Sequence, residues 1–85
     1  MPEPTRSEVL KEIAASISRL SGVPEAGITE GQLLVGDLKL DSLAIYELVV
    51  DLEERFGMQI TNEDAEDLET VGEAVDYVCR RLSDG

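Results

Sequence analysis

Ser42 is the residue of this sequence with the clearest potential for chemistry. The triplet Asp41-Ser42-Leu43 opens a stretch of helical periodicity, and a serine at a helix start is usually the N-cap. Here Asp41 can cap the helix instead, and no Glu or Gln stands three residues after Ser42, where Ile45 lies. We therefore expect an exposed Ser42 hydroxyl at the first helical position. The helix dipole would favour a phosphate attached there, although Asp37 and Asp41 oppose it.

Residues that usually perform catalysis are scarce in this chain. It has no histidine, which removes the usual general base and any Ser-His or Cys-His pair. Its one cysteine, Cys79, can form neither an internal disulfide nor a cysteine-based zinc site, and it lies beside an apolar helical stripe. We expect Cys79 to be a partly buried structural thiol. The sequence thus predicts no catalytic residue, no metal site and no enzyme activity.

Length and charge limit the classes of partner. With 85 residues, the chain is expected to form a single domain over residues 1–85, folded from about residue 5 to 83. Its 19 acidic and 7 basic residues give a net charge of −12, which disfavours nucleic acids and anionic membranes and favours basic protein surfaces. The polar start Met1–Pro4 does not resemble a signal peptide, and no segment could span a bilayer. We expect a soluble, cytoplasmic protein.

Capping patterns and apolar periodicity predict an all-α fold with three longer helices and one short helix. The first helix begins at the capping box Thr5–Glu8 and ends at Ser21-Gly22. The others are expected at Ser42–Phe56, at Asn62–Leu68 with Thr61 as its cap, and from the capping box Thr70–Glu73 onward, with these residues facing inward: Val71, Ala74, Val75, Val78 and Leu82. The acidic residues 63–69 are expected to form a solvated helix face.

A long connection, residues 23–41, joins the first two helices. Such a loop is long for so small a domain, and loops of this kind often position functional groups. We expect it to be pinned across the bundle, with one helical turn after Thr29, by the burial of five apolar residues: Ile28, Leu33, Leu34, Leu38 and Leu40.

The second helix has two apolar faces. One is the expected core face, formed by Ile45, Leu48, Val49, Leu52 and Phe56. The opposite face carries Leu43, Tyr46 and Val50, flanked by Glu47, Glu53 and Glu54. Apolar groups supply buried area and carboxylates orient a basic partner, so we interpret these six residues as a docking ridge.

The segment Asp37-Leu38-Lys39-Leu40-Asp41-Ser42-Leu43 resembles the D-L-x-x-D-S-L attachment motif of the acyl carrier protein family. The similarity is detailed from Leu33 to Leu82 and looser in the first helix. It continues through Glu47-Leu48, residues 52–57, Ile60, Asn62-Glu63-Asp64 and residues 70–78.

This resemblance implies an acyl-carrier-like four-helix bundle in which Ser42, flanked by Asp41 and Leu43, carries 4′-phosphopantetheine. A separate phosphopantetheinyl transferase would deliver the arm from coenzyme A with magnesium, and the arm's thiol would hold acyl groups as thioesters. The six ridge residues match positions that the family uses to dock its partners. The implied partners are ketosynthases, acyltransferases or acyl ligases and tailoring enzymes with basic patches, and the carrier itself is expected to be a monomer.

Three residues depart from the family's common pattern. Lys39 stands where many relatives have Gly or an acid, Ala44 where fatty-acid carriers often have an acid, and Tyr46 where a small aliphatic residue is common. These departures favour a dedicated, free-standing type II carrier of polyketide or related biosynthesis over a housekeeping fatty-acid carrier.

Two other functions remain open and a third is disfavoured. One is a carrier of aminoacyl or peptidyl groups, although such carriers usually have Gly-Gly where this chain has Leu40-Asp41. Another is an unmodified acidic adaptor with the same fold. A calcium-binding EF-hand starting at Asp37 would place Ser42 at the invariant glycine and Leu48 at the bidentate glutamate, so it fails at both positions.

Overall fold

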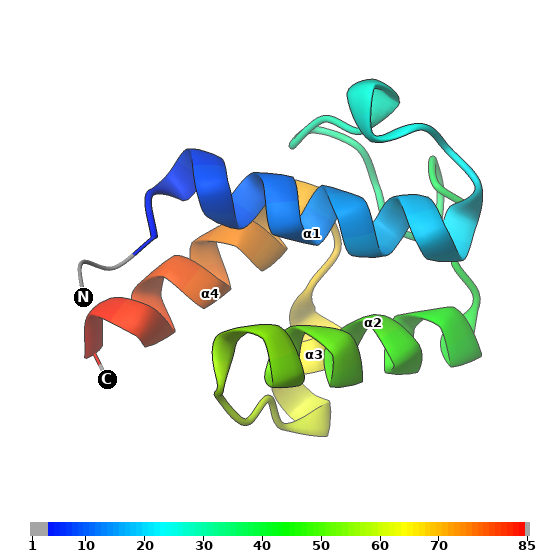
Figure 1. Cartoon of the computed structure of the whole chain (residues 1–85). Coiled ribbons are helices and arrows are strands. Elements are labelled where there is room, and N and C mark those ends of the chain that lie inside the picture. Colours follow the sequence, from blue (N-terminus) through cyan, green and yellow to red (C-terminus); the bar gives the residue numbers. More distant parts are fainter. Residues whose placement is uncertain (1–3, 85) are drawn as a thin grey trace.

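The computed structural model describes residues 4–84, and its regular structure is helical (Figure 1). The elements are α1 (Arg6–Ser21), a short 3-10 helix η1 (Glu25–Gly27), α2 (Ser42–Phe56), α3 (Asn62–Asp67) and α4 (Val71–Asp84). Helix α1 packs against both α2 and α4. The prediction of three longer helices, one short helix and a long connection between the first two longer helices is therefore confirmed.

The expected folded part, residues 5–83, falls inside the described range. Residues 1–3 and 85 of the expected domain lie outside it, and so does most of the polar start Met1–Pro4 on which the expectation about a signal peptide rests. None of the described helices is long and apolar enough to cross a membrane.

Local capping fixes the helix ends where the sequence predicts them. The Thr5 hydroxyl accepts from the Glu8 N–H at 3.1 Å, and the Glu8 carboxylate accepts from the Thr5 N–H at 3.0 Å. Thr70 and Glu73 form the same reciprocal pair at the start of α4. Helices α1 and α2 end at glycines in the left-handed conformation, Gly22 and Gly57. The end of α3 is one residue earlier than predicted.

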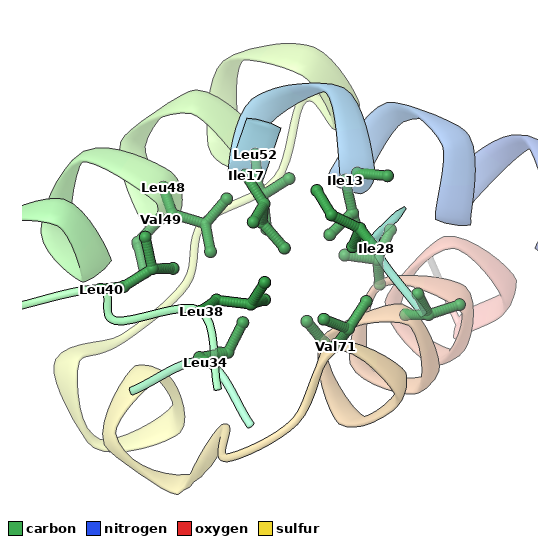
Figure 2. Close-up of a cluster of buried hydrophobic side chains, with 14 of the residues drawn as sticks. Ile13, Ile17, Ile28, Leu34, Leu38, Leu40, Leu48, Val49, Leu52 and Val71 are labelled. Carbon is green, nitrogen blue, oxygen red and sulfur yellow. The ribbon is translucent and has the colours of Figure 1, made fainter. Parts of the chain in front are cut away.

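The buried apolar side chains of the described residues form one core between α1, α2 and α4 (Figure 2). Its centre consists of side chains at most 2% exposed: Val9, Ile13 and Ile17 of α1, Leu48 and Leu52 of α2, and Val71, Val75 and Val78 of α4. Ile45, Phe56 and Leu82 are partly buried at its edge. The core face predicted for the second helix is thus the face that packs.

The long connection is pinned across this core, as expected. Ile28, Leu34, Leu38 and Leu40 are at most 7% exposed, and Figure 2 shows the three leucines among the side chains of the helices. Backbone hydrogen bonds join the loop to the start of α4, from Leu34 N to the Glu69 carbonyl at 2.8 Å and from Gly72 N to the Glu30 carbonyl at 2.9 Å.

One expectation about this loop is wrong, and another is confirmed only in part. Leu33 is 43% exposed, because it lies in a short extended bridge opposite Thr70 in which neighbouring side chains point to opposite sides, and Leu34 takes the inward position. The 3-10 helix is η1, directly after Pro24, whereas the chain after Thr29 forms a single hydrogen-bonded turn, in which the Gln32 N–H donates to the Thr29 carbonyl at 3.3 Å. Proline favours the start of such a turn, whereas the N–H of Thr29 donates to the Gln32 side chain at 2.9 Å.

A polar network joins α1 to α2 and was not predicted from the sequence. The fully buried hydroxyl of Ser16 donates to the carboxylate of Asp51, whose side chain is 18% exposed. Arg55 donates to Asp51 at 3.0 Å and also pairs with Glu12. Arg19 lies 3.4 Å from the same Asp51 oxygen. These contacts fix the orientation of α2, the helix that carries both the predicted attachment site and the predicted ridge.

Candidate functional site

Ser42 is the first residue of α2, and its side chain is exposed. Asp41 is the N-cap in an extended conformation, and its carboxylate accepts from the Ala44 N–H at 2.8 Å. Within residues 4–84 the Ser42 hydroxyl has no hydrogen-bond partner on another side chain or on the backbone. Because Asp41 does the capping, the hydroxyl remains available at the positive end of the helix, as predicted.

The segment before Ser42 is held rigidly. The Asp37 carboxylate accepts from the Leu33 N–H at 2.7 Å, and this hydrogen bond closes the turn that precedes Leu38. Leu38 and Leu40 are buried on either side of Lys39, which is exposed. Lys39 adopts φ of 60°, and it is the one residue of the described range other than glycine with positive φ. This conformation favours glycine, so Lys39 is strained at this position.

A groove of about 580 Å³ opens beside Ser42, between α2 and α3. Its apolar lining consists largely of Val35, Ile45, Tyr46, Val49, Ala65 and Leu68. Asp41 and Ser42 lie at its polar edge. A group attached to the Ser42 oxygen could therefore extend either into solvent or along this groove.

The exposed face of α2 displays most of the predicted ridge. Leu43 and Tyr46 are 66% and 62% exposed, Glu47 and Glu54 are exposed, and Val50 is partly buried. Glu53 is different, because its carboxylate accepts from the Ile60 N–H at 2.8 Å and it is only partly exposed. Glu53 therefore has a structural role in holding the segment between α2 and α3, whatever it contributes to docking.

Sequence reasoning missed Val35, which is 64% exposed and lines the groove beside Ser42. The large exposed hydrophobic residues of the described range are Leu33, Val35, Leu43 and Tyr46. All four lie in the loop before Ser42 or in the first turns of α2. The apolar run of residues 33–35 could have drawn attention to this loop, but it does not reveal which side chains point outward.

Among the titratable groups of residues 63–81, Glu66 lines the groove beside Ser42, and the others lie outside it. Glu63, Glu66, Asp67 and Glu69 are exposed, as expected for a solvated face. Asp64 instead accepts from the Tyr77 hydroxyl at 2.7 Å, and partial burial together with this contact raises the pKa of Tyr77. Cys79 is partly buried, as predicted. A broad hollow of about 1000 Å³ around Tyr77 and Arg81 includes neither Ser42 nor the ridge.

Comparison with known proteins agrees with this geometry. The family model described as "Phosphopantetheine attachment site" matches residues 11–78. The acyl carrier protein of Rubrobacter xylanophilus is 45% identical over 73 residues, 86% of this chain and 90% of the relative. That of Thermotoga maritima is 37% identical over 78 residues, 92% and 96% of the two chains. The solved structure of the acyl carrier protein from Enterococcus faecalis superposes with a TM-score of 0.77 at 42% identity, covering 91% of this chain and 98% of that chain.

The chain therefore belongs to the acyl carrier protein family. It is a carrier with a covalently attached 4′-phosphopantetheine, and it is not an enzyme. Proteins of this family interact with a phosphopantetheinyl transferase and with biosynthetic enzymes. The surroundings of Ser42 fit such a group, because an exposed hydroxyl without a capping role lies at a helix N-terminus beside an apolar groove.

Proposed function

We propose that Ser42 carries the 4′-phosphopantetheine arm and that the chain acts as a single carrier domain. The observation that carries this proposal is the exposed Ser42 hydroxyl, which Asp41 relieves of the capping role. When bound, the arm supplies a thiol that holds acyl groups as thioesters. The protein's own residues have a different task. They present the arm at a fixed helix end and offer the ridge of α2 to partner enzymes.

The rigid loop supports this task. Buried Leu34, Leu38 and Leu40 hold the segment before Ser42, so the attachment point has a defined position relative to α2. A partner that recognises α2 therefore also recognises where the arm begins. The tether keeps the acyl group at a high effective concentration near the partner's active site.

The test is intact mass after incubation with coenzyme A, magnesium and a broad-specificity phosphopantetheinyl transferase. We expect a gain of one phosphopantetheinyl group in the wild type and in Ser7→Ala, a matched change at another exposed serine. Ser42→Ala should show no gain while its circular dichroism stays helical. A modified Ser42→Ala protein would place the arm elsewhere, and an unmodified wild type would favour an acidic adaptor.

We further propose that the carrier serves type II polyketide or fatty-acid-like biosynthesis, with ketosynthases, acyltransferases or acyl ligases and tailoring enzymes as partners. Support for specialised biosynthesis comes from the exposed Lys39 and Tyr46 and from uncharged Ala44 close to Ser42. A ketosynthase primed with an acyl thioester should transfer that acyl group to the malonyl group of the loaded protein, with release of carbon dioxide and of the ketosynthase thiol. We expect a higher kcat/KM for this condensation with a polyketide ketosynthase than with a fatty-acid ketosynthase. Equal or reversed rates would assign it to primary fatty-acid synthesis, and loading by an adenylation enzyme with an amino acid would assign it to aminoacyl transfer.

A further inference from the structure

Helix α3 forms one wall of the groove beside Ser42. Asn62, Ala65 and Glu66 of α3 line this groove together with Leu68, while α2 lines its other side. The helix has six residues and contributes no buried side chain to the core. A helix this short is not stable by itself in water, so its position depends on contacts with the rest of the fold.

One side chain ties α3 to another helix. The Tyr77 hydroxyl of α4 donates to the Asp64 carboxylate at 2.7 Å. Within residues 4–84 this is the single hydrogen bond between a residue of α3 and another helix, and no ion pair includes α3. Ala65 and the following Leu68 pack against the edge of the core. The hydrogen bond from Tyr77 is therefore the directional contact that can fix the position of the helix.

Tyr77 is itself held by Arg81, one turn further along α4. The Arg81 guanidinium donates to the Tyr77 oxygen at 2.7 Å and lies 5.6 Å from the centre of the Tyr77 ring. A cation that donates to a hydroxyl oxygen polarises its O–H bond, which strengthens the hydrogen bond that the hydroxyl donates in turn. We call Arg81, Tyr77 and Asp64 together the α3 latch.

The latch and the groove lie on different faces of α3. Asp64 and Asp67 line the broad hollow around Tyr77, whereas Ala65 and Glu66 line the groove beside Ser42. The hollow has a volume of about 1000 Å³, so there is space on the latch side of α3 into which the helix could move. Such a movement would widen the groove on the other face.

We propose that Tyr77 is the positioning residue that fixes α3 as the wall of the groove, and that the α3 latch thereby limits the width of the group that the groove admits. The first part concerns the fold alone, and the second rests on the proposed function of the chain as a carrier loaded at Ser42. With the latch closed, α3 keeps the groove at its observed width. With the latch broken, α3 moves into the hollow, and a bulkier group attached through the arm fits beside α2.

The first test uses the unloaded protein and measures how often α3 leaves its position, by ¹⁵N relaxation dispersion of the backbone amides. Tyr77→Phe removes only the hydroxyl, and it should raise the population of the displaced state by about five- to thirtyfold, since the lost hydrogen bond has a charged acceptor. Arg81→Gln should raise the same population by a smaller factor, because Tyr77 keeps its bond to Asp64. The exchange should be confined to residues 62–68 and the groove residues of α2.

Matched changes separate the latch from a general loss of stability. Asp64→Ala removes the acceptor and should reproduce the exchange of Tyr77→Phe, and the double variant should add little, because both changes break one bond. Asp67→Ala and Arg80→Gln alter neighbouring side chains that have no hydrogen bond or ion pair in the described range, and they should leave α3 in place. Exchange that is absent in Tyr77→Phe, or that spreads equally over α1 and α4, would refute Tyr77 as the positioning residue.

The second test measures the width limit on the loaded protein. The transferase attaches arms from butyryl-coenzyme A and from 3,3-dimethylbutyryl-coenzyme A, whose acyl chains have the same length and differ in width. In each loading the Ser42 oxygen bonds to the phosphorus of the arm, adenosine 3′,5′-bisphosphate leaves with the electron pair of the broken P–O bond, and the serine proton is released. Amide shifts relative to the protein with the bare arm report entry into the groove at Ile45, Val49, Ala65 and Leu68.

The two acyl groups should differ in the wild type and not in the variant. In the wild type the butyryl shifts should exceed the dimethylbutyryl shifts at least about twofold, because a fixed wall resists extra methyl groups. In Tyr77→Phe the two sets of shifts should be equal. Absent shifts for both groups, equal shifts in the wild type, or an unchanged ratio in Tyr77→Phe would overturn the width limit. A wild type that gains no arm would refute the carrier proposal, and the relaxation measurement on the unloaded protein would still decide whether Tyr77 fixes α3.

Discussion

Replacing Ser16 with alanine would remove the buried hydroxyl that α1 donates to Asp51 of α2. A hydrogen bond to a charged group contributes about 1.5–3 kcal/mol, and the better helix propensity of alanine offsets up to about 0.5 kcal/mol. Asp51 keeps its contacts with Arg55 and Arg19, so it is not left as an isolated charge. We therefore expect the free energy of unfolding near neutral pH to fall by about 1–2.5 kcal/mol. That is a large share of the roughly 4–13 kcal/mol typical of a chain this size.

The loss should depend on pH, because the Ser16 hydroxyl is the largest cause of the lowered pKa of Asp51. A carboxyl with a lower pKa in the folded state stabilises the fold above its unfolded pKa of about 3.9. That stabilisation disappears as the pH falls through the folded value. The difference between wild type and Ser16→Ala should therefore be full near pH 7 and should shrink by at least about half near pH 3.

Urea unfolding followed by far-UV circular dichroism at about pH 7 and about pH 3 measures both quantities. Ser18→Ala is the matched control, since Ser18 lies on the same helix and its side chain has no hydrogen bond within the described residues. In the Asp51→Asn background, Ser16→Ala should cost clearly less, because the charged acceptor is gone. The reasoning is refuted if Ser16→Ala loses the same free energy at both pH values, or loses as much in the Asp51→Asn background as in the wild type.

Three further predictions concern strain, burial and charge. Lys39→Gly should raise the free energy of unfolding by about 0.5–1 kcal/mol, seen as a higher urea midpoint, because glycine tolerates the positive φ of this position. A lower urea midpoint would argue against that conformation. Leu48→Ala, at a side chain 2% exposed, should cost about 2–5 kcal/mol in unfolding free energy. Leu43→Ala, at a side chain 66% exposed, should cost less than about 0.5 kcal/mol yet raise the KM for loading, and a stability loss as large as that of Leu48→Ala would contradict the assigned faces. The net charge of −12 predicts a melting temperature that rises by several degrees from about 10 to about 300 mM NaCl, and scanning calorimetry showing a flat value would exclude strong self-repulsion.

The helices could be predicted from the sequence because their ends are decided locally. The Thr5–Glu8 and Thr70–Glu73 capping boxes need only residues three apart, and Gly22 and Gly57 end helices by their own backbone freedom. The availability of Ser42 could be anticipated for the same reason, since Asp41 is its immediate neighbour. These features need no knowledge of the tertiary fold.

The loop and the interhelix contacts depend on partners far along the chain. In the apolar run of residues 33–35, only the hydrogen bonds of the loop with Glu69 and with the start of α4 decide that Leu34 points inward and that Leu33 and Val35 point outward. Asp51 falls between the two apolar faces of α2, so helical periodicity gives it no role. Its role follows from Ser16, which is 35 residues away, and sequence spacing does not reveal such a pair.

The distribution of ion pairs bears on why this chain is so acidic. In the described range, Arg6 pairs with Glu30 and Asp76, Arg55 with Glu12 and Asp51, and Arg19 with Asp51. Apart from the pair of Arg55 with Asp51 inside α2, each of these contacts joins α1 to another part of the fold. The arginines that form them thus neutralise carboxylates where elements meet, and Glu47 and Glu54 on the outer face of α2 receive none of this compensation. The exposed carboxylates of α3, Glu63, Glu66 and Asp67, are in no ion pair of the described range either, so compensation is confined to contacts between elements and does not by itself mark one face. The outer face of α2 differs in that its carboxylates stand beside the exposed apolar side chains Leu43 and Tyr46, so a basic partner that meets α2 next to Ser42 finds charge and apolar area together.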